Sequence, residues 1–314
     1  MDIAIAVFSF RRPEKLRLVL EALRGAKVAK LYHFCDGPRN AADEQLCTAN
    51  RQIAQSVDTG IPTEYQLLEK NIGLTQNLIG GIDHVLSKHE AIIVLEDDIV
   101  PTSQFFEFIK EGLNTFKEHS DIFSISGYNP LTREETPTGP AFLSPRFFCW
   151  GWATWATKWH SISLMVNSGA SPYEHYWMVP GTAGTDFRWG VRSWGMGRKE
   201  LIWDQRVALN TLYRGFHHIC PSETLISNIG FDGSGENCPA SSQSVSASTS
   251  INSHTKLLTD IQPDETVYRK IALQHSLPPE SFAKRTRRRV NYAIRTFLNK
   301  LNSRAINIKK TIPL

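Results

Sequence analysis

The chain of 314 residues is 41% hydrophobic and 21% charged, which is typical of globular proteins and excludes a disordered or fibrous one. Its formal charge of +4 is unevenly distributed: residues 284–314 carry ten Lys or Arg and no acid, which leaves 25 basic and 31 acidic side chains, a net −6, on residues 1–283. An acidic body argues against a nucleic acid partner, whereas the basic end suits an anionic surface.

The cysteines and the start of the chain indicate a reduced, intracellular protein. Five cysteines make an odd number without a CxxC pair, which favours neither a disulfide scaffold nor a zinc cluster. Residues 1–10 have no basic region before their short apolar run, and no stretch reaches the roughly 18 apolar residues of a membrane span. We therefore expect a soluble body in the cytoplasm.

The first 125 residues alternate predicted strands and helices. The run from Ile3 to Phe8 is almost continuously apolar, as in a strand covered on both faces, and a helix opens at Arg12-Pro13. Strands are also predicted at 31–35 and 91–95, with a weaker one at 64–68, and helices at 74–88 and 104–116. This alternation is typical of an α/β fold with a doubly wound, mostly parallel sheet.

Polar residues follow three of these strands, at the ends where such sheets bind ligands. They are Ser9–Arg12, Asp36 in the turn signal Asp36-Gly37-Pro38, and Glu96–Asp98. No GxGxxG follows the first strand and no GxxxxGK[ST] occurs, so neither a common dinucleotide fold nor a P-loop is supported. The phosphates of a nucleotide would have to be held in another way.

Beyond Tyr128 the pattern becomes irregular, and all eight tryptophans fall between Trp150 and Trp203. A helix is predicted at 204–213, and the Ser-rich residues 239–255 are typical of a flexible loop. From Phe282 onward, apolar residues recur at spacings of three and four among basic ones. This predicts a basic amphipathic helix on a membrane surface; a helix packed on the body or an RNA-contacting tail also fits.

The three consecutive carboxylates Glu96–Asp98 repel one another unless a cation or a hydrogen-bonding ligand offsets the repulsion. Mg²⁺ or Mn²⁺ held by one carboxylate and by substrate phosphates would do so, and would stabilise a diphosphate leaving group. An acidic turn before the next helix is the simpler interpretation. His217 and His218 are adjacent on a predicted strand and face opposite ways, so at most one of them could reach a metal.

The chain resembles the GT-A glycosyltransferases at these carboxylates. Leu95-Glu96-Asp97-Asp98-Ile99-Val100-Pro101 and the following Phe105-Phe106-Glu107-Phe108 are similar to their acidic DxD-type motif and the helix after it. Within that fold the sequence is most similar to the N-acetylglucosaminyltransferase that starts complex N-glycan branching, to its bacterial relatives and to the glycosyltransferase family 2-like group. The other matching motifs, all within residues 3–238, are Phe10-Arg11-Arg12-Pro13, Cys35-Asp36-Gly37-Pro38, Asn71-Ile72-Gly73-Leu74, Gly151-Trp152-Ala153-Thr154-Trp155, Trp203-Asp204 and Asn228-Ile229-Gly230-Phe231.

The resemblance implies that Asp98 ligates the metal, while Glu96 and Asp97 lie near the ribose and phosphates of a nucleotide sugar. It places Arg12 and Asp36 where the family contacts the nucleotide base, with Ser9 on the same side. Arg11 is adjacent to Arg12, so either arginine could point inward. The simpler interpretations are a solvent-facing Arg12 and an Asp36 that only forms a turn.

An inverting transfer needs a base for the proton of the acceptor hydroxyl. Trp203-Asp204 matches the family's Trp-Asp motif that supplies this carboxylate, so the resemblance implies that Asp204 is the base. The family's eukaryotic members show a second Asp where this chain has Gln205. Asp204 as a helix N-cap is the simpler interpretation, and Asp186 is the reserve candidate for the base.

The resemblance further implies an acceptor pocket and a lid. Trp150, Gly151 and Trp152 would line the acceptor pocket, because Trp faces stack on sugar rings, although a Trp-rich block is equally typical of a core. Asn228, Gly230 and Asp232 belong to a Gly-rich segment that in the family closes over the donor sugar; a plain surface loop also fits.

The resemblance as a whole implies a metal-dependent inverting glycosyltransferase, a hexosyl- or N-acetylhexosaminyltransferase. Its donor would be a nucleotide-diphosphate sugar, expected to be UDP-linked, and its acceptor a saccharide or lipid-linked saccharide of surface glycans. The basic end would hold it on the inner membrane face. The expected organisation is a GT-A domain at 1–238 (nucleotide and metal half 1–128, acceptor half 129–238), a flexible loop at 239–255 and a helical extension at 256–314.

Two other classes of protein share some of these features. A sugar nucleotidyltransferase also uses carboxylates and a metal, but should show a Gly-rich, Lys-containing loop where this chain reads Ser9-Phe10-Arg11-Arg12-Pro13. A non-catalytic carbohydrate-binding module would explain the tryptophans but not three polar strand ends.

Overall fold

The structure is a computed structural model that describes residues 1–197, 200–233, 245–247 and 261–276. The predicted basic amphipathic helix, most of the Ser-rich segment and Cys238 lie outside the described residues. Within them, Cys35, Cys47, Cys149 and Cys220 are free thiols, as the reduced interpretation requires.

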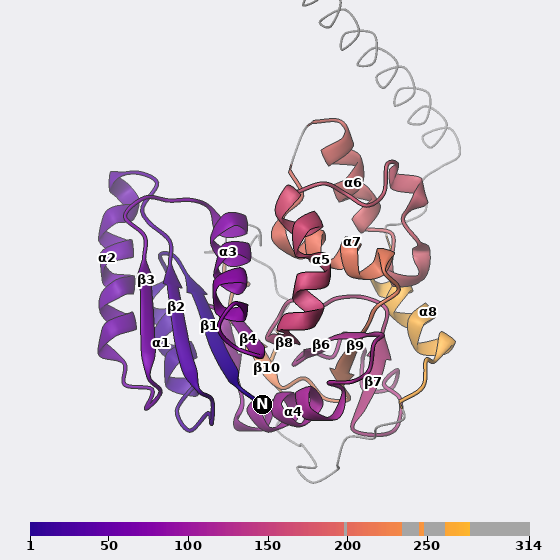
Figure 1. Cartoon of the computed structure of the whole chain (residues 1–314), viewed down its shortest axis with the longest axis horizontal. Helices are drawn as coiled ribbons and strands as arrows, with labels where there is room; N and C mark the ends of the chain where they lie inside the picture. The colour runs from indigo at the N-terminus through magenta and orange to yellow at the C-terminus, as the bar shows by residue number, and fades with distance from the viewer. Residues whose placement is uncertain (198–199, 234–244, 248–260, 277–314) are drawn as a thin grey trace, which may run out of the picture.

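The described chain is an α/β protein built on one eight-stranded sheet, in the order β3-β2-β1-β4-β8-β6-β9-β7 (Figure 1). Its first half is parallel and confirms the alternating pattern of the sequence. These strands are β1 (Ile3–Ser9), β2 (Lys30–Cys35), β3 (Thr63–Leu67) and β4 (Ala91–Glu96). All seven residues of β1 are buried, because strands lie on both of its sides and helices on both of its faces.

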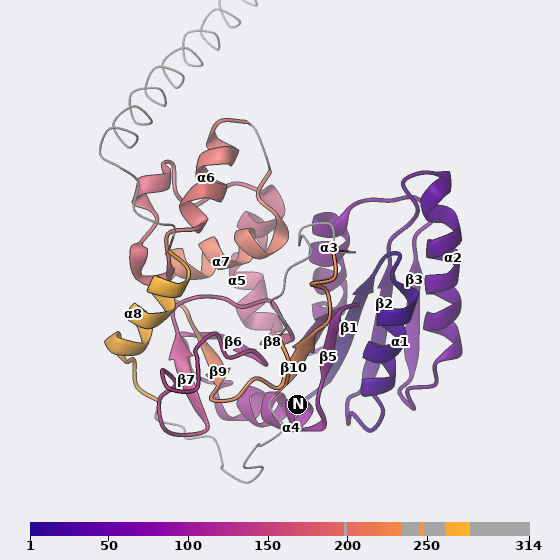
Figure 2. The same ribbon diagram turned by 180° about the vertical axis from the view of Figure 1, so that it is seen from behind.

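The sheet continues without a break into the second half, where the sequence pattern was irregular. β8 (Trp152–Trp155) inserts antiparallel between β4 and β6 (Ile122–Ser126), β9 (His217–Pro221) runs parallel to β6, and β7 (Ala141–Ser144) is antiparallel at the edge. A small second sheet pairs β5 (Ile99–Pro101) with β10 (Ile226–Asn228), side by side in Figure 2. The two halves therefore share one sheet.

Helices cover both faces of the sheet, so it is doubly wound. One hydrophobic cluster joins one face to α1 (Pro13–Ala22), α2 (Ala41–Ser56), α4 (Ser103–Thr115) and α8 (Glu265–Gln274). The other cluster joins the opposite face to α3 (Leu74–Leu86), α5 (Ala156–Ser168), α6 (Phe187–Gly195) and α7 (Trp203–Tyr213). The short 3₁₀ helices η1 (Tyr176–Met178) and η2 (Gly181–Ala183) precede α6.

Several elements were not expected from the sequence pattern, among them two helices that pack on the sheet. Helix α2 is largely polar and begins at Asn40, whose side chain accepts hydrogen bonds from the amides of Ala42 and Asp43. Helix α8 lies in the region expected to be an extension, yet Val267 and Ile271 are buried in the main core. The predicted boundary between domain and extension is therefore corrected: α8 is part of the folded body.

No helix in the described part of the chain has the length and apolar character to cross a membrane.

His217 and His218 face opposite sides of β9, as predicted. His218 is fully buried, and its Nδ1 lies 2.7 Å from the hydroxyl oxygen of Ser124. The His217 ring stacks on Tyr268. No group of three metal-ligating side chains includes either of them among the described residues. Burial lowers the pKa of His218 from 6.5 to about 3, so the folded protein holds it neutral.

This burial predicts a loss of stability in acid. Above pH 6.5, His218 is neutral in both the folded and the unfolded chain. Below pH 6.5, the imidazole of the unfolded chain binds a proton, whereas the buried imidazole of the folded chain stays neutral. The free energy of unfolding therefore falls as the pH drops from 6.5 toward 3. We expect His218→Gln to lose less stability between pH 7 and pH 5 than the native chain. Urea unfolding at both pH values measures this, with the exposed His160→Gln as control. An unchanged pH dependence in His218→Gln would contradict it.

Candidate functional site

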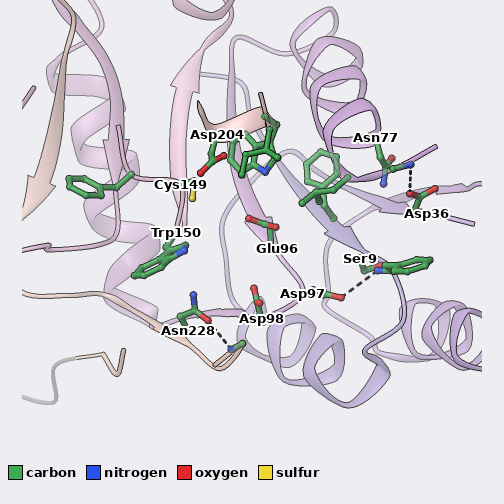
Figure 3. Close-up of a pocket in the computed structure, with 18 of the residues that line it drawn as sticks. Ser9, Asp36, Asn77, Glu96, Asp97, Asp98, Cys149, Trp150, Asp204 and Asn228 are labelled. Carbon is green, nitrogen blue, oxygen red and sulfur yellow. Dashed lines mark hydrogen bonds between the residues drawn. The ribbon is translucent and has the colours of Figure 1, made fainter. Parts of the chain in front are cut away.

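A cavity of about 610 Å³ lies at the carboxyl ends of β1, β2 and β4 and extends under the second half (Figure 3). Its lining includes all three polar strand ends of the sequence analysis, on one side, and residues of the Trp-rich half on the other. Adjacent parallel strands bring the three clusters together: Phe8 of β1 pairs with Glu96 of β4, and Ser9 with Cys35 of β2.

Arg12 forms ion pairs with two carboxylates of the acidic triplet. Its guanidinium is bonded to a carboxylate oxygen of Asp97 and, at 2.8 Å, to Oδ2 of Asp98, and the Phe10 amide also donates to Asp97. Arg11 also lines the cavity, and it pairs with Asp43 at 2.7 Å. Arg12 is the arginine that reaches the triplet, and its guanidinium meets Asp97 and Asp98 rather than facing solvent.

The electrostatics of this group follow from burial and crowding. Burial raises the pKa of Glu96 well above 4.5, with Asp98, Asp97 and Asp204 adding to the effect. Burial also raises the pKa of Asp97, although Arg12 opposes the shift. Burial acts to lower the pKa of Arg12, but the two aspartates raise it overall. The site thus concentrates negative charge and offsets part of it with one arginine.

The carboxylate of Asp36 lines the cavity and also holds its rim together. It accepts hydrogen bonds from the amides of Gly37, Ile72 and Gly73 and from the side chain of Asn71, at 2.8 to 3.0 Å. A side chain at Gly37 would collide with the backbone of Lys70. Asp36 therefore acts as the turn former that the simpler interpretation describes, and its contact with a nucleotide base stays a prediction.

Ser9 lines the same rim of the cavity. Its hydroxyl lies 2.8 Å from Nε2 of His33 and accepts a hydrogen bond of 2.8 Å from the Asn50 amide. Burial lowers the pKa of His33 to about 4, so the ring is neutral. The network fixes the Ser9 hydroxyl at the end of β1.

Asp204 enters the cavity from the other half, in the first turn of α7 after Ile202 at the N-cap position. Its Oδ1 accepts from the amide of Gln205 at 2.8 Å, and burial raises its pKa although Arg146 opposes the shift. Gln205 packs against Gly190 of α6 and does not line the cavity. The structure thus places Asp204, and not its neighbour, within the site.

The reserve candidate Asp186 is engaged elsewhere. Both of its carboxylate oxygens pair with Arg146, at 2.7 and 2.8 Å, and it caps α6 through the amide of Phe187. It does not line the cavity. Asp186 therefore orders Arg146, whose guanidinium also lies 4.0 Å from the centre of the Phe187 ring.

The three residues expected to bind the acceptor separate in the structure. Trp150 lines the cavity, and its ring meets the edges of Tyr128 and Phe231 at 4.6 and 5.8 Å. Trp152 does not: its side chain is fully buried and stacks on Trp203, so the expected acceptor contact is corrected to a core role.

Gly151 does not line the cavity either, which corrects the second acceptor assignment. Its φ of +63° favours glycine, and a side chain there would meet Ile226 at 2.9 Å. Gly151 thus turns the chain between Trp150, which faces the cavity, and Trp152, which faces the core.

The described part of the predicted lid segment forms one wall of the cavity. Asn228 and Gly230 line it, and the amide of Ile229 donates to the backbone oxygen of Asp98 at 2.9 Å. A side chain at Gly230 would collide with the Asp98 carboxylate. Asp232 is outside the cavity lining and pairs with Lys15 of α1 at 2.7 Å. The described part of this segment is thus joined to the acidic triplet.

Sequence reasoning missed several cavity residues, among them two charged or titratable ones from the second half. Arg146 follows Pro145 in an irregular stretch with no periodicity to mark it, and His275 ends α8 in the region expected to be an extension. The backbone oxygen of His275 accepts from the amides of Thr185 and Asp186, which ties α8 to the cavity wall. Arg146 and His275 reach the site because the segments that carry them pack into the same folded unit as the sheet.

The donor set was compared with what a divalent cation requires. Among the described residues, no three His, Cys, Asp or Glu side chains are grouped so as to hold a metal ion by themselves. Mg²⁺ and its analogues are commonly held by one or two carboxylates together with substrate phosphates and water. Asp98, at the cavity surface beside the lid, fits that mode of binding, in which the substrate supplies the remaining ligands.

The burial of Trp152 predicts a large effect on stability. We expect Trp152→Ala to lower the free energy of unfolding by about 3–5 kcal/mol, because it opens a cavity between Trp159 and Trp203. Leu164→Ala, at a side chain that is 85% exposed, should stay within about 0.5 kcal/mol of the native chain. Denaturant unfolding measures both, and near-native stability of Trp152→Ala would show that the indole is not part of the core.

Compared with known proteins, the chain matches no family model and no curated protein.

Proposed function

We propose that the protein is a metal-dependent glycosyltransferase of the GT-A kind, which transfers a sugar from a nucleotide-diphosphate donor to a saccharide acceptor. The proposal rests on one observation: the acidic triplet, the two other polar strand ends and Asp204 all line the same cavity. Four segments that the resemblance assigns to donor, metal and base share one enclosed space, although they are up to 195 positions apart in the sequence (Ser9 to Asp204).

The donor side of the proposed site is the sheet edge around the triplet. Asp98 would hold Mn²⁺ or Mg²⁺ with the diphosphate oxygens, and the bound ion would stabilise the charge on the departing diphosphate. Arg12 keeps Asp97 and Asp98 together before substrate arrives and adds positive charge beside the phosphates. Ser9 and the Asp36 loop form the rim that would hold the nucleoside, which we expect to be uridine.

Asp204 would act from the acceptor side. Its carboxylate accepts the acceptor hydroxyl proton while the acceptor oxygen bonds to the anomeric carbon; the bond from that carbon to the diphosphate breaks, and its electron pair leaves with the diphosphate. Burial raises the pKa of Asp204, which makes it a stronger base than an exposed aspartate. Attack from the face opposite the diphosphate inverts the anomeric configuration. Trp150 offers a ring for the acceptor sugar to stack on.

The basic end completes the proposal. Its ten basic residues and absence of acids would hold the enzyme on an anionic membrane at the cytoplasmic face, where lipid-linked glycans are built. Liposome flotation of chains with and without residues 284–314 measures this contribution.

The metal assignment predicts that Asp98→Asn lowers sugar transfer about 100-fold or more, because removing one charge-stabilising group from a transfer site typically costs this much. The variant keeps the side-chain shape and an oxygen for Arg12. Transfer and donor hydrolysis should be measured over a Mn²⁺ titration, with the exposed Glu14→Gln as control. Undiminished activity in Asp98→Asn would remove Asp98 from the metal site.

The base assignment predicts that Asp204→Asn binds donor almost normally but loses transfer by about 10²–10⁴-fold, the usual contribution of a general base. Gln205→Asn is the matched control, because this neighbouring side chain packs on α6 and should leave kcat within a few-fold. Calorimetry with the nucleotide and kcat measured at saturating donor separate binding from chemistry. Retained transfer in Asp204→Asn, or an equal loss in both variants, would reject the assignment.

A further inference from the structure

An exposed aromatic surface lies on the outer side of the second half, away from the cavity lining. Trp177 and Met178 of η1 and Trp189 of α6 are 44%, 50% and 51% exposed. Arg188 of α6 joins the two elements, since its guanidinium donates to the backbone oxygen of Val179 at 3.1 and 3.2 Å. We call Trp177, Met178 and Trp189 the aromatic patch.

Helix α6 brings two arginines, Arg188 and Arg192, and no acid to the aromatic patch. The exposed Glu174 lies three residues before Trp177. The guanidinium of Arg192 lies 5.6 Å from the Trp189 ring, and Asp186, at the start of α6, is already paired with Arg146. Indole rings interleaved with arginines suit the interface of an anionic bilayer, where the ring enters the headgroup region and the guanidinium meets phosphates.

We propose that the aromatic patch docks the protein on an anionic lipid surface, independently of the basic end of the chain. The patch and the cavity are two sides of the same short helix: Phe187 of α6 lines the cavity, whereas Trp189 is exposed. A bilayer that touches Trp189 would therefore lie beside the acceptor side of the cavity. This last step, which makes the acceptor lipid-linked, rests on the proposed function; the docking itself does not.

The position of the tryptophans allows a direct test. All eight lie between residues 150 and 203, so binding through residues 284–314 brings no indole into the lipid. The full chain is mixed with vesicles of phosphatidylcholine and phosphatidylglycerol that carry a spin-labelled lipid, which quenches indole fluorescence on contact. We expect quenching in the native chain and its loss in Trp177→Phe/Trp189→Phe, which keeps two aromatic rings and removes the two indoles.

Cosedimentation with unlabelled vesicles gives a second readout. Trp177→Ser/Trp189→Ser should bind about tenfold more weakly or worse, because two large apolar side chains no longer leave water. Leu164→Ser removes an 85% exposed apolar residue from α5 and should bind as the native chain does.

Three results would overturn the proposal. They are binding without quenching, quenching that the Phe variant retains, and absence of vesicle binding by the native chain. In the last case, a change in the oligomeric state of the Ser variant would assign the patch to a second copy of the chain. None of these readouts involves sugar transfer. The glycosyltransferase proposal can therefore fail while lipid docking stands, and the reverse.

Discussion

The ion pairs between Arg12 and the two aspartates after β4 are the interaction on which the site depends. Three consecutive carboxylates at the end of a buried strand cannot all be charged without a counterion, and Arg12 supplies one from the loop after the neighbouring strand. Removing one partner of such a buried pair typically costs about 3–5 kcal/mol, because it leaves an uncompensated charge. The parallel pairing of β1 with β4 is what brings the two loops together.

The same triplet organises the segments around it. The backbone of Asp98 binds the amide of Ile229, and its carboxylate occupies the space that a side chain at Gly230 would need. Lys15, one turn beyond Arg12 on α1, pairs with Asp232 at the far end of the same segment. The loop after β1, the acidic triplet and the segment after β10 are therefore mechanically connected.

The parallel half of the fold was predictable because three of its strands, β1, β2 and β4, are short and mostly apolar runs that polar residues follow. The fourth, β3, contains Thr63, Glu64 and Gln66 and gave a weaker signal. The antiparallel insertion of β8 was not, since pairing with β4 joins residues about 60 positions apart and leaves no local signal. The same limit explains the errors at the site. Trp150 and Trp152 are alike in sequence, and only the turn at Gly151 sends one toward the cavity and the other into the core.

Burial decided which charged residues face the cavity. Asp204 was the expected base and Asp186 the reserve candidate, and the structure shows Asp186 bound on both oxygens by an arginine that no pattern had marked. Arg12, which was expected beside a nucleotide base, contacts the carboxylates in this structure, and its contact with a base stays a prediction. The proposed function therefore depends on whether the acidic end of β4 holds a nucleotide through a metal ion.

Calorimetric titration of the native chain with UDP, in Mn²⁺ and then in EDTA, tests that question most directly. The proposed metal site predicts that UDP binds in Mn²⁺ and that this binding is lost when EDTA removes the metal. Equal binding in EDTA, or no binding of UDP or any other nucleoside diphosphate in Mn²⁺, would contradict it.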